Sequence, residues 1–318
     1  MAADRRRDGV EASVVLVSKD EPALSITLTE LQRQAAEAPV PVELLVIDAS
    51  SGRLATVAER HPQVRWIDFA APPGAATTIA HQRNVGVAAA RGATIVFIDA
   101  GCTPHPNWLT ELLAPIIDDG ELVVAGAESS SITAAEERAG RQYVAQAPTL
   151  NLAVARPVVA AIGGFDETFA YGSDLDFSWR ATDAGVRIRL APAAVVTHDW
   201  GGLVRQAQRG LRYGRAKARL YAKHPRRLRG AWRTDPMTLV YPPFVLWLLC
   251  ARRRARPLAL LAVPLWRNRR RRPVVTVVHH LAFGIGVLDG LIRQPLVAVL
   301  QYDKRWHESA GRRGSGGS

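Results

Sequence analysis

In the first 200 residues, short aliphatic runs alternate with stretches of helical spacing, and this alternation limits the folds open to the chain. Each run predicts a strand buried on both faces, because it is short, apolar and rich in Val and Ile. The predicted strands are residues 13–18, 43–48, 64–67, 94–99 and 121–127, and the predicted helices are residues 24–38, 52–62, 77–92 and 106–120. Strand–helix alternation of this kind predicts an α/β fold with a mostly parallel central sheet and flanking helices.

Two acidic residues stand where such a fold binds its ligands. Open sheets of parallel strands bind ligands beyond the carboxyl ends of their strands. Asp48 and Asp99 each end a predicted strand. Both carboxylates are therefore candidates for a binding site at that edge of the sheet.

The charge of the chain divides sharply between its two parts. Residues 1–200 contain 16 Lys and Arg against 25 Asp and Glu, a balance of −9, whereas residues 201–318 contain 25 against 4, a balance of +21. A separate basic segment of this kind predicts contact with a polyanion, either nucleic acid or an anionic lipid surface. The sequence shows no zinc spacing and no RNA-binding aromatic signature, so nucleic acid is not expected as a partner.

Apolar segments in the basic part favour the lipid surface. A basic amphipathic helix is predicted over residues 203–230, and three apolar segments follow at 237–251, 255–266 and 274–292. The first two are too short, or too interrupted by proline, for a hydrocarbon core of about 30 Å, which needs about 20 apolar residues. The third is long enough but contains two histidines and an aspartate. Together with the arginine run at 267–272, these segments predict that residues 203–308 attach to the membrane in a peripheral or re-entrant way.

The cysteine content and the first residues of the chain indicate the cellular compartment. Cys102 and Cys250 are too few for a disulfide framework or a thiolate metal site, which fits a reducing cytosol. The first residues are charged, with no apolar region behind them, so a secretory signal is not expected. Residues 1–11 and 309–318 are predicted to be flexible.

Five sequence blocks, in order, resemble the family 2 glycosyltransferases of the GT-A fold. The blocks are SVVLVSKDEPALSITLTELQRQ, ELLVIDASSG, RNVGVAAARGATIVFIDAGCTPHPNWL, NLAVARPVVAAIGGFDETFAYGSDLDFSWRATDAGVRI and VVTHDW. The resemblance runs from about residue 12 to residue 225, and it implies a GT-A nucleotide-sugar-binding domain over residues 12–202. It also implies transfer of a sugar from a nucleotide-diphosphate sugar with inversion at the anomeric carbon.

The resemblance assigns four residues to the donor nucleotide, Asp48, Arg83, Asn84 and Asp99. Asp48 would bind the base or the ribose, and the alternative is a strand-end turn closed by Ser50 or Ser51. Arg83 and Asn84 would line the nucleotide pocket near the diphosphate, and the alternative is a pair on the helix surface.

The metal motif of the family is incomplete in this chain. Asp99 matches the first acid of the DxD motif, but the sequence reads Asp99-Ala100-Gly101 and lacks the second. Mn²⁺ or Mg²⁺ can still be held by few protein carboxylates, because phosphate and water supply the other oxygens. His198 matches the late histidine of the family and is a candidate ligand that suits Mn²⁺. A structural role for this histidine is the alternative.

The catalytic and acceptor residues come from the fourth and fifth blocks. Asp174 matches the proposed general base, although Ser173 stands where the family has Glu. Asp176 matches the second acid of this segment and, with Gly164 and Trp200, is a candidate acceptor-binding residue. The alternatives are stabilisation of a helix N-terminus by the two acids and an ordinary turn at residues 163–167.

These assignments predict an inverting glycosyltransferase at the cytosolic membrane face. The donor is expected to be a UDP-sugar and the acceptor a hydroxyl group of a lipid-linked sugar or another glycan, with Asp174 as the base. The absent acids at positions 101 and 173 leave open a catalytically impaired relative that binds nucleotide-sugar and acts through partners. The donor sugar, the linkage and the oligomeric state do not follow from the sequence.

Overall fold

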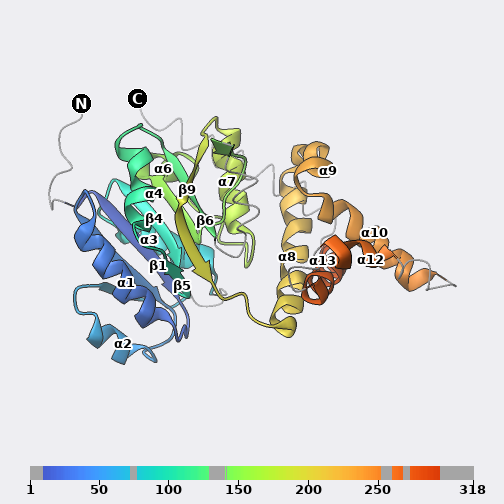
Figure 1. Ribbon diagram of the computed structural model, residues 1–318, viewed down its shortest axis with the longest axis horizontal. Coiled ribbons are helices and arrows are strands. Elements are labelled where there is room, and N and C mark those ends of the chain that lie inside the picture. The colour runs from blue at the N-terminus through green and yellow to red at the C-terminus, as the bar shows by residue number, and fades with distance from the viewer. Residues whose placement is uncertain are drawn as a thin grey trace. The chain divides into compact units, whose positions relative to one another are not determined.

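The computed structural model describes residues 10–71, 77–128, 140, 142–251, 260–267 and 273–293. The chain divides into two compact units, residues 1–199 and 200–318 (Figure 1). The predicted flexible tail at 309–318 lies outside the described residues, as do residues 1–9 of the predicted flexible N-terminus. At Glu11 the backbone N–H already donates to the Pro41 carbonyl at 2.9 Å, so the ordered fold begins before residue 12.

Strands and helices alternate through the first unit as the sequence predicts. They are β1 Ala12–Ser18, α1 Leu24–Glu37, β2 Val42–Asp48, α2 Ala55–Arg60, β3 Arg65–Asp68, α3 Ile79–Ala89, β4 Thr94–Asp99, β5 Cys102–Pro104, α4 Trp108–Ile117, β6 Val123–Glu128, β7 Tyr143–Val144, β8 Asn151–Ala155, α6 Arg156–Ala161, α7 Ser173–Asp183 and β9 Ile188–His198. All five predicted strands and all four predicted helices are present.

One sheet joins these strands in the order β3-β2-β1-β4-β8-β6-β9-β5, with β7 paired to β9. The pairings β3–β2, β2–β1 and β1–β4 are parallel, so the first half of the sheet is as predicted. The second half is mixed, because β8 runs antiparallel to both β4 and β6. In the parallel half, Ser18 is in register with Asp48 and Val17 with Asp99, which brings these strand ends to one edge.

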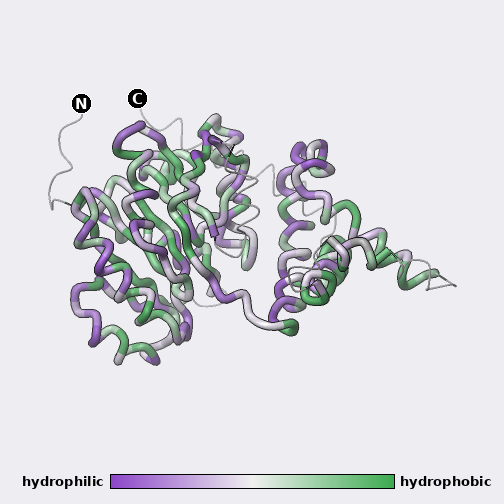
Figure 2. The backbone as a smooth tube through the Cα atoms, viewed as in Figure 1, coloured by the Kyte–Doolittle hydropathy of each residue, from purple (hydrophilic) through white to green (hydrophobic). Residues whose placement is uncertain are grey.

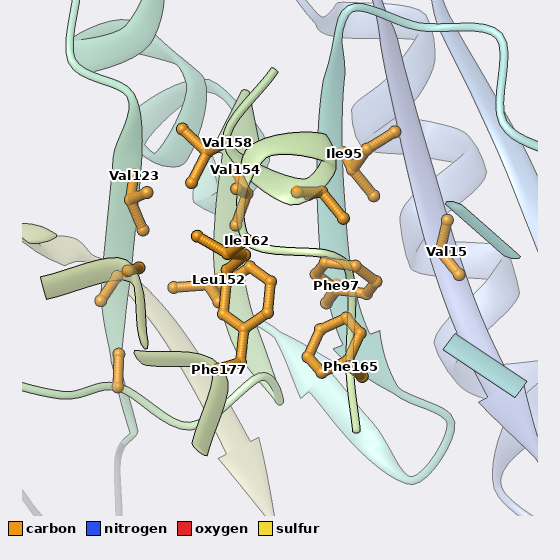
Figure 3. Close-up of a cluster of buried hydrophobic side chains, with 14 of the residues drawn as sticks. Val15, Ile95, Phe97, Val123, Leu152, Val154, Val158, Ile162, Phe165 and Phe177 are labelled. Atoms are coloured by element: carbon orange, nitrogen blue, oxygen red, sulfur yellow. The ribbon is translucent and has the colours of Figure 1, made fainter. Parts of the chain in front are cut away.

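Alternate residues of each strand form the cores on the two faces of the sheet. On one face, Phe97 from β4 packs edge-on against Phe165, which stacks on Phe177 of α7 at 4.5 Å between ring centroids (Figure 3). Helices α3, α6 and α7 contribute to this cluster. On the other face, α1 packs on β2 and β5, and α4 packs on β6, β8 and β9. Burial on both faces explains the continuous apolar runs.

The second unit consists of helices. They are α8 Leu203–Lys223, the 3₁₀ helix η2 Pro225–Gly230, α9 Ala231–Thr234, α10 Pro236–Cys250, α12 Ala262–Arg267 and α13 Pro273–Arg293. Helix α8 packs along α13 so closely that their backbones are in contact. A β-carbon added at Gly286 would lie 2.2 Å from the Leu211 carbonyl oxygen. Asp289 of α13 forms ion pairs with Arg215 of α8 and Arg293. A basic helix and an apolar helix therefore form one packed pair.

Helix α13 alone among the described helices is long and apolar enough to cross a bilayer, judged by length and composition. In its most apolar window, 39% is buried within the protein. Its two histidines have partners on neighbouring helices: His279 Nδ1 lies 3.0 Å from the Gln206 carbonyl, and His280 Nδ1 lies 2.8 Å from the Tyr241 hydroxyl. Burial lowers the pKa of His280 to about 4, so this side chain is neutral at physiological pH.

Candidate active site

The predicted strand-end carboxylate Asp48 is buried at the carboxyl edge of the parallel strands. The Ser50 hydroxyl donates to its Oδ1 at 2.6 Å, and the backbone N–H of Asp20 donates to that hydroxyl at 2.7 Å. From α3, the Gln82 amide donates to the carbonyls of Ser18 and Ile47. The contact with Ser50 is the turn interaction given as the alternative for Asp48, and it also fixes the carboxylate at the edge where sheets of this type bind ligands.

Arg83 lies at the centre of the site. Its side chain is 7% exposed, and its Nη2 donates to Asp99 Oδ1 at 3.0 Å. The guanidinium also lies 5.7 Å from the Phe165 ring centroid, over the ring. The alternative of a helix-surface pair is therefore wrong for Arg83, which is buried and bound to the first acid of the incomplete DxD motif.

Asp174, the predicted base, is adjacent to the same two groups. It lies in the first turn of α7, and its Oδ1 accepts from the Leu175 backbone N–H at 2.9 Å. Desolvation raises the pKa of the Asp174 carboxyl, and the Asp99 charge raises it further, while the Arg83 charge and the Leu175 N–H act in the opposite direction. The N-cap residue of α7 is Gly172, whose backbone is in the left-handed region, and Ser173 is the first residue of the helix itself.

Asn84 ties α3 to the glycine turn at residues 163–167. Its amide Nδ2 donates to the Phe165 carbonyl at 2.8 Å and to Glu167 Oε1 at 2.7 Å, and its Oδ1 accepts from the Phe165 N–H. Gly164 has a φ of 73°, and a β-carbon there would lie 2.8 Å from Asn84 Oδ1. Glycine is required at this position by both conformation and space. Asn84 thus acts on the site by holding the turn, in addition to any contact with the nucleotide.

The prediction that Asp176 binds the acceptor is wrong. Its side chain is fully buried and accepts from Arg180 Nε at 2.8 Å, one helical turn along α7. The same Arg180 donates to the carbonyls of Ile162 and Gly164. A carboxylate with no exposed surface cannot reach a substrate, and this one anchors the arginine that holds the glycine turn.

Glu21, which the sequence analysis did not select, lies beside the vacant position of the DxD motif. A β-carbon added at Gly101 would lie 3.2 Å from the Glu21 Cδ and 3.3 Å from its Oε2. Burial raises the pKa of the neighbouring Cys102 thiol, and the charges of Asp99, Glu128 and Glu21 raise it further. Three carboxylates thus lie around this short loop.

His198, the second candidate metal ligand, lies at the end of β9. It is the register partner of Cys102 in the β5–β9 pairing, which places it across from the loop that follows Asp99. His198 is thus on the strand paired with the segment that follows the DxD loop, and its role as a metal ligand stays a prediction. Trp200, the remaining acceptor candidate, belongs to the second unit, where its ring stacks under the Arg209 guanidinium at 4.0 Å.

The carboxylates near Asp99 fit a divalent cation that arrives with a nucleotide. Within the described part of the chain, no group of three or more His, Cys, Asp or Glu side chains is placed to hold a metal ion. Asp99 nevertheless offers a carboxylate that is 32% exposed, and Glu21 offers a second one beside Gly101, two residues further along the chain. Two carboxylates are a sufficient protein contribution for Mg²⁺ or Mn²⁺ when a diphosphate and water complete the coordination.

The fold is that of the GT-A glycosyltransferases. The structure resembles the mannosyltransferase PcManGT from Pyrobaculum calidifontis, solved in complex with GDP-Man and Mn²⁺, with a TM-score of 0.64 and 17% sequence identity. The match covers 89% of this chain and 87% of that chain. At this identity the likeness establishes the shared fold.

Sequence comparison finds similarity to glycosyltransferases in the first unit. Residues 13–162 match the family described as glycosyl transferase family 2. The chain is 30% identical over 187 residues to the pre-mycofactocin glycosyltransferase of Mycobacterium tuberculosis, and 31% identical over 131 residues to the glycosyltransferase AglE of Haloferax volcanii. These matches cover 52% and 36% of this chain, and 38% and 42% of the two relatives. The sequence similarity to family 2 glycosyltransferases therefore lies within the first unit.

Proposed function

We propose that this chain is an inverting glycosyltransferase that uses a nucleotide-diphosphate sugar, with Asp174 as the general base. The observation that carries the proposal is the convergence of Asp174 and Asp99 on the buried Arg83. A carboxylate whose pKa is raised above its ordinary value binds a proton more strongly than a free aspartate does, which suits a general base.

The proposed reaction is a single in-line displacement. The acceptor oxygen attacks the anomeric carbon while Asp174 takes the proton of the acceptor hydroxyl, and the bond to the nucleoside diphosphate breaks. One base on the side of attack inverts the anomeric configuration. Arg83 lies where its positive charge offsets the charge that develops on the diphosphate. A divalent ion, when bound by Asp99, supplies further positive charge to this leaving group.

The nucleotide is proposed to lie along the strand edge with Asp48 at its base or ribose. The register of β1, β2 and β4, whose carboxyl ends form the edge, supports this proposed position. UDP remains the proposed donor nucleotide. Because the mannosyltransferase of the same fold was solved with GDP-Man, guanine has to be compared with uracil.

The acceptor is proposed to be a lipid-linked sugar or other glycan at the cytosolic face of a membrane. Exposed apolar side chains support this attachment: among them are Val240 and Leu249 on α10, Trp266 on α12, and Val274 and Ile292 on α13. Figure 2 shows hydrophobic residues along α10 and α13 and hydrophilic residues along α8. This composition suits an interface between lipid headgroups and acyl chains.

A peripheral position is favoured over a transmembrane one. Helix α13 is bound along its length to α8, and the ion pair between Arg215 and Asp289 lies between them. Insertion of α13 would either carry the basic residues of α8 into the hydrocarbon core or break this packing. Both are costly, because each charged residue at the centre of a membrane helix costs about 2.5–3.5 kcal/mol.

Calorimetric titration of the full chain with UDP and GDP, with and without Mn²⁺, tests the donor site. The expected result is binding of UDP that is tighter with Mn²⁺ and weakened in Asp99→Ala. Binding that ignores Mn²⁺ would keep the transferase proposal and remove the metal from it. If neither nucleotide binds, the donor-site assignment is wrong.

A further inference from the structure

We propose that Glu21 supplies the second donor-site carboxylate in place of the acid missing at Gly101. The inference rests on the proposed function, because it concerns how the same site holds a divalent ion and a nucleoside diphosphate. It assigns a metal-binding role to a residue outside the DxD segment, 80 positions earlier in the chain.

The first observation is one of space. Gly101 does not have a positive φ, so its backbone admits an L side chain without strain. The side-chain volume that would begin at its β-carbon is instead bordered by the Glu21 carboxylate, with Oε2 at 3.3 Å and Oε1 at 3.5 Å from that carbon. An Asp at position 101 and a Glu at position 21 would therefore bring like charges together, and the glycine leaves one carboxylate there.

The second observation concerns how Glu21 is held. Its Oε1 accepts from the Ala23 backbone N–H at 3.1 Å, just before α1 begins. On α1, the Thr27 hydroxyl lies 2.8 Å from the carbonyl oxygens of both Ala100 and Cys102. These bonds fasten the loop that contains Gly101 to the helix that positions Glu21. The Ala23 N–H thus holds the Glu21 carboxylate, and the buried Thr27 contacts hold the Gly101 loop against the same helix.

The third observation concerns charge. Within the described residues, the Glu21 carboxylate has no ion-pair partner, whereas Asp99 is paired with Arg83 and Asp20 with Arg53. An unneutralised carboxylate next to Asp99 would repel a free diphosphate. A divalent ion between the carboxylates and the diphosphate turns this repulsion into attraction. Hard ions of this kind take carboxylate oxygens as ligands.

The competing explanation is that Glu21 only caps α1. Glu21→Gln separates the two, because its amide oxygen can still accept from Ala23 while the charge is lost. If Glu21 binds the ion, the Mn²⁺-dependent affinity for UDP, measured by calorimetry, should fall by about 10-fold or more. In EDTA the same variant should bind UDP at least as tightly as the wild type, because a like charge has been removed. If Glu21 only caps α1, Glu21→Gln should not weaken UDP binding in Mn²⁺ and strengthen it in EDTA.

The rescue variant is Glu21→Gln combined with Gly101→Asp. It places a carboxylate on the β-carbon position that faces the neutral amide, and it should restore Mn²⁺-dependent binding toward the wild-type value. Asp119→Asn is the matched control, since it removes one exposed carboxylate in the turn after α4 and should leave both affinities unchanged. The electron paramagnetic resonance spectrum of Mn²⁺ with UDP gives a second readout of the bound ion.

The outcomes distinguish this inference from the function on which it rests. If the wild type binds UDP with Mn²⁺ and Glu21→Gln does so equally well, Glu21 is a helix cap and only this inference is overturned. Wild-type binding that is independent of Mn²⁺ overturns the role of Glu21 and leaves the nucleotide site. A wild type that binds neither UDP nor GDP overturns the proposed donor site, and the Glu21 assignment with it.

Discussion

At the scale of single residues, Asp174 and Asp176 show how position along one helix separates an accessible carboxylate from a buried structural one. The two acids are two residues apart in α7, so their side chains leave the helix in different directions. Asp174 stays partly exposed near Arg83 and Asp99, whereas Asp176 is fully buried against Arg180. The first can act on a substrate and the second can only hold the fold.

Replacing Asp174 by Asn should abolish most of the activity without unfolding the protein. Removal of a general base lowers kcat by about 10²–10⁴-fold. Steady-state transfer kinetics with the donor identified by titration provide the measurement. Asp183→Asn, the same chemical change on an exposed residue at the other end of α7, is the control and should leave kcat unchanged. An Asp174→Asn enzyme with wild-type kcat would show that another group is the base.

The raised pKa of Asp174 predicts that Asp174→Asn does not lose stability, although it loses activity. The folded protein binds the Asp174 proton more readily than the unfolded chain, whose ordinary value is 3.8. Ionisation therefore lowers the free energy of unfolding as pH rises from that value through the folded pKa. At neutral pH, Asp174→Asn should melt at a temperature no lower than the wild type. In the wild type, kcat/KM should fall with decreasing pH, with an apparent pKa above the ordinary Asp value of 3.8.

At the scale of elements, the site depends on contacts that join α1, α3 and α7 to loops far away in sequence. Asn84 on α3 holds the glycine turn from one side, and Arg180 on α7 holds it from the other. Thr27 on α1 holds the loop between β4 and β5. The loops at the strand edge are thus positioned by buried polar side chains on the helices that cover both faces of the sheet.

Thr27→Val tests this coupling of helix to loop. The change keeps the shape of the side chain but removes the one hydroxyl proton that two buried carbonyls share, so it should lower the free energy of unfolding by about 1–3 kcal/mol. It should also weaken Mn²⁺-dependent nucleotide binding, because the loop with Asp99 and Gly101 loses its fastening. Urea denaturation and calorimetry are the measurements. Thr29→Val, on an exposed part of the same helix, should change stability by less than about 0.5 kcal/mol. Equal effects of the two variants would contradict the coupling.

At the scale of the whole molecule, charge and apolar surface are divided between the two units. The acidic first unit contains the proposed nucleotide site, and the second unit contains most of the basic charge and the apolar helices α10 and α13. An acidic domain is repelled by an anionic membrane and a basic one is attracted to it. The division therefore favours an enzyme that attaches through its second unit alone.

The full chain should bind vesicles that contain phosphatidylglycerol more tightly than vesicles of phosphatidylcholine, and salt should weaken the binding without abolishing it. Each Leu or Ile side chain that enters the apolar layer contributes about 1.5–3 kcal/mol. The double variant Leu249→Ser and Ile292→Ser should therefore bind at least about tenfold more weakly in flotation assays. Ile26→Ser, an exposed residue of the first unit, is the control. Binding to oligonucleotides but not to vesicles would favour a nucleic acid partner instead.

The sequence by itself determined the alternation of strands and helices, the strand-end positions of Asp48 and Asp99, and the separation of an acidic domain from a basic apolar region. These features follow from local periodicity and composition, which a single sequence contains. The tertiary structure alone decided the antiparallel course of β8, the burial of Asp176 and the approach of Glu21 to Gly101. Each of these depends on contacts between segments distant in the chain or on which side of a helix faces the core. A missing carboxylate is visible in a sequence, but the residue that fills its space is defined only by the fold.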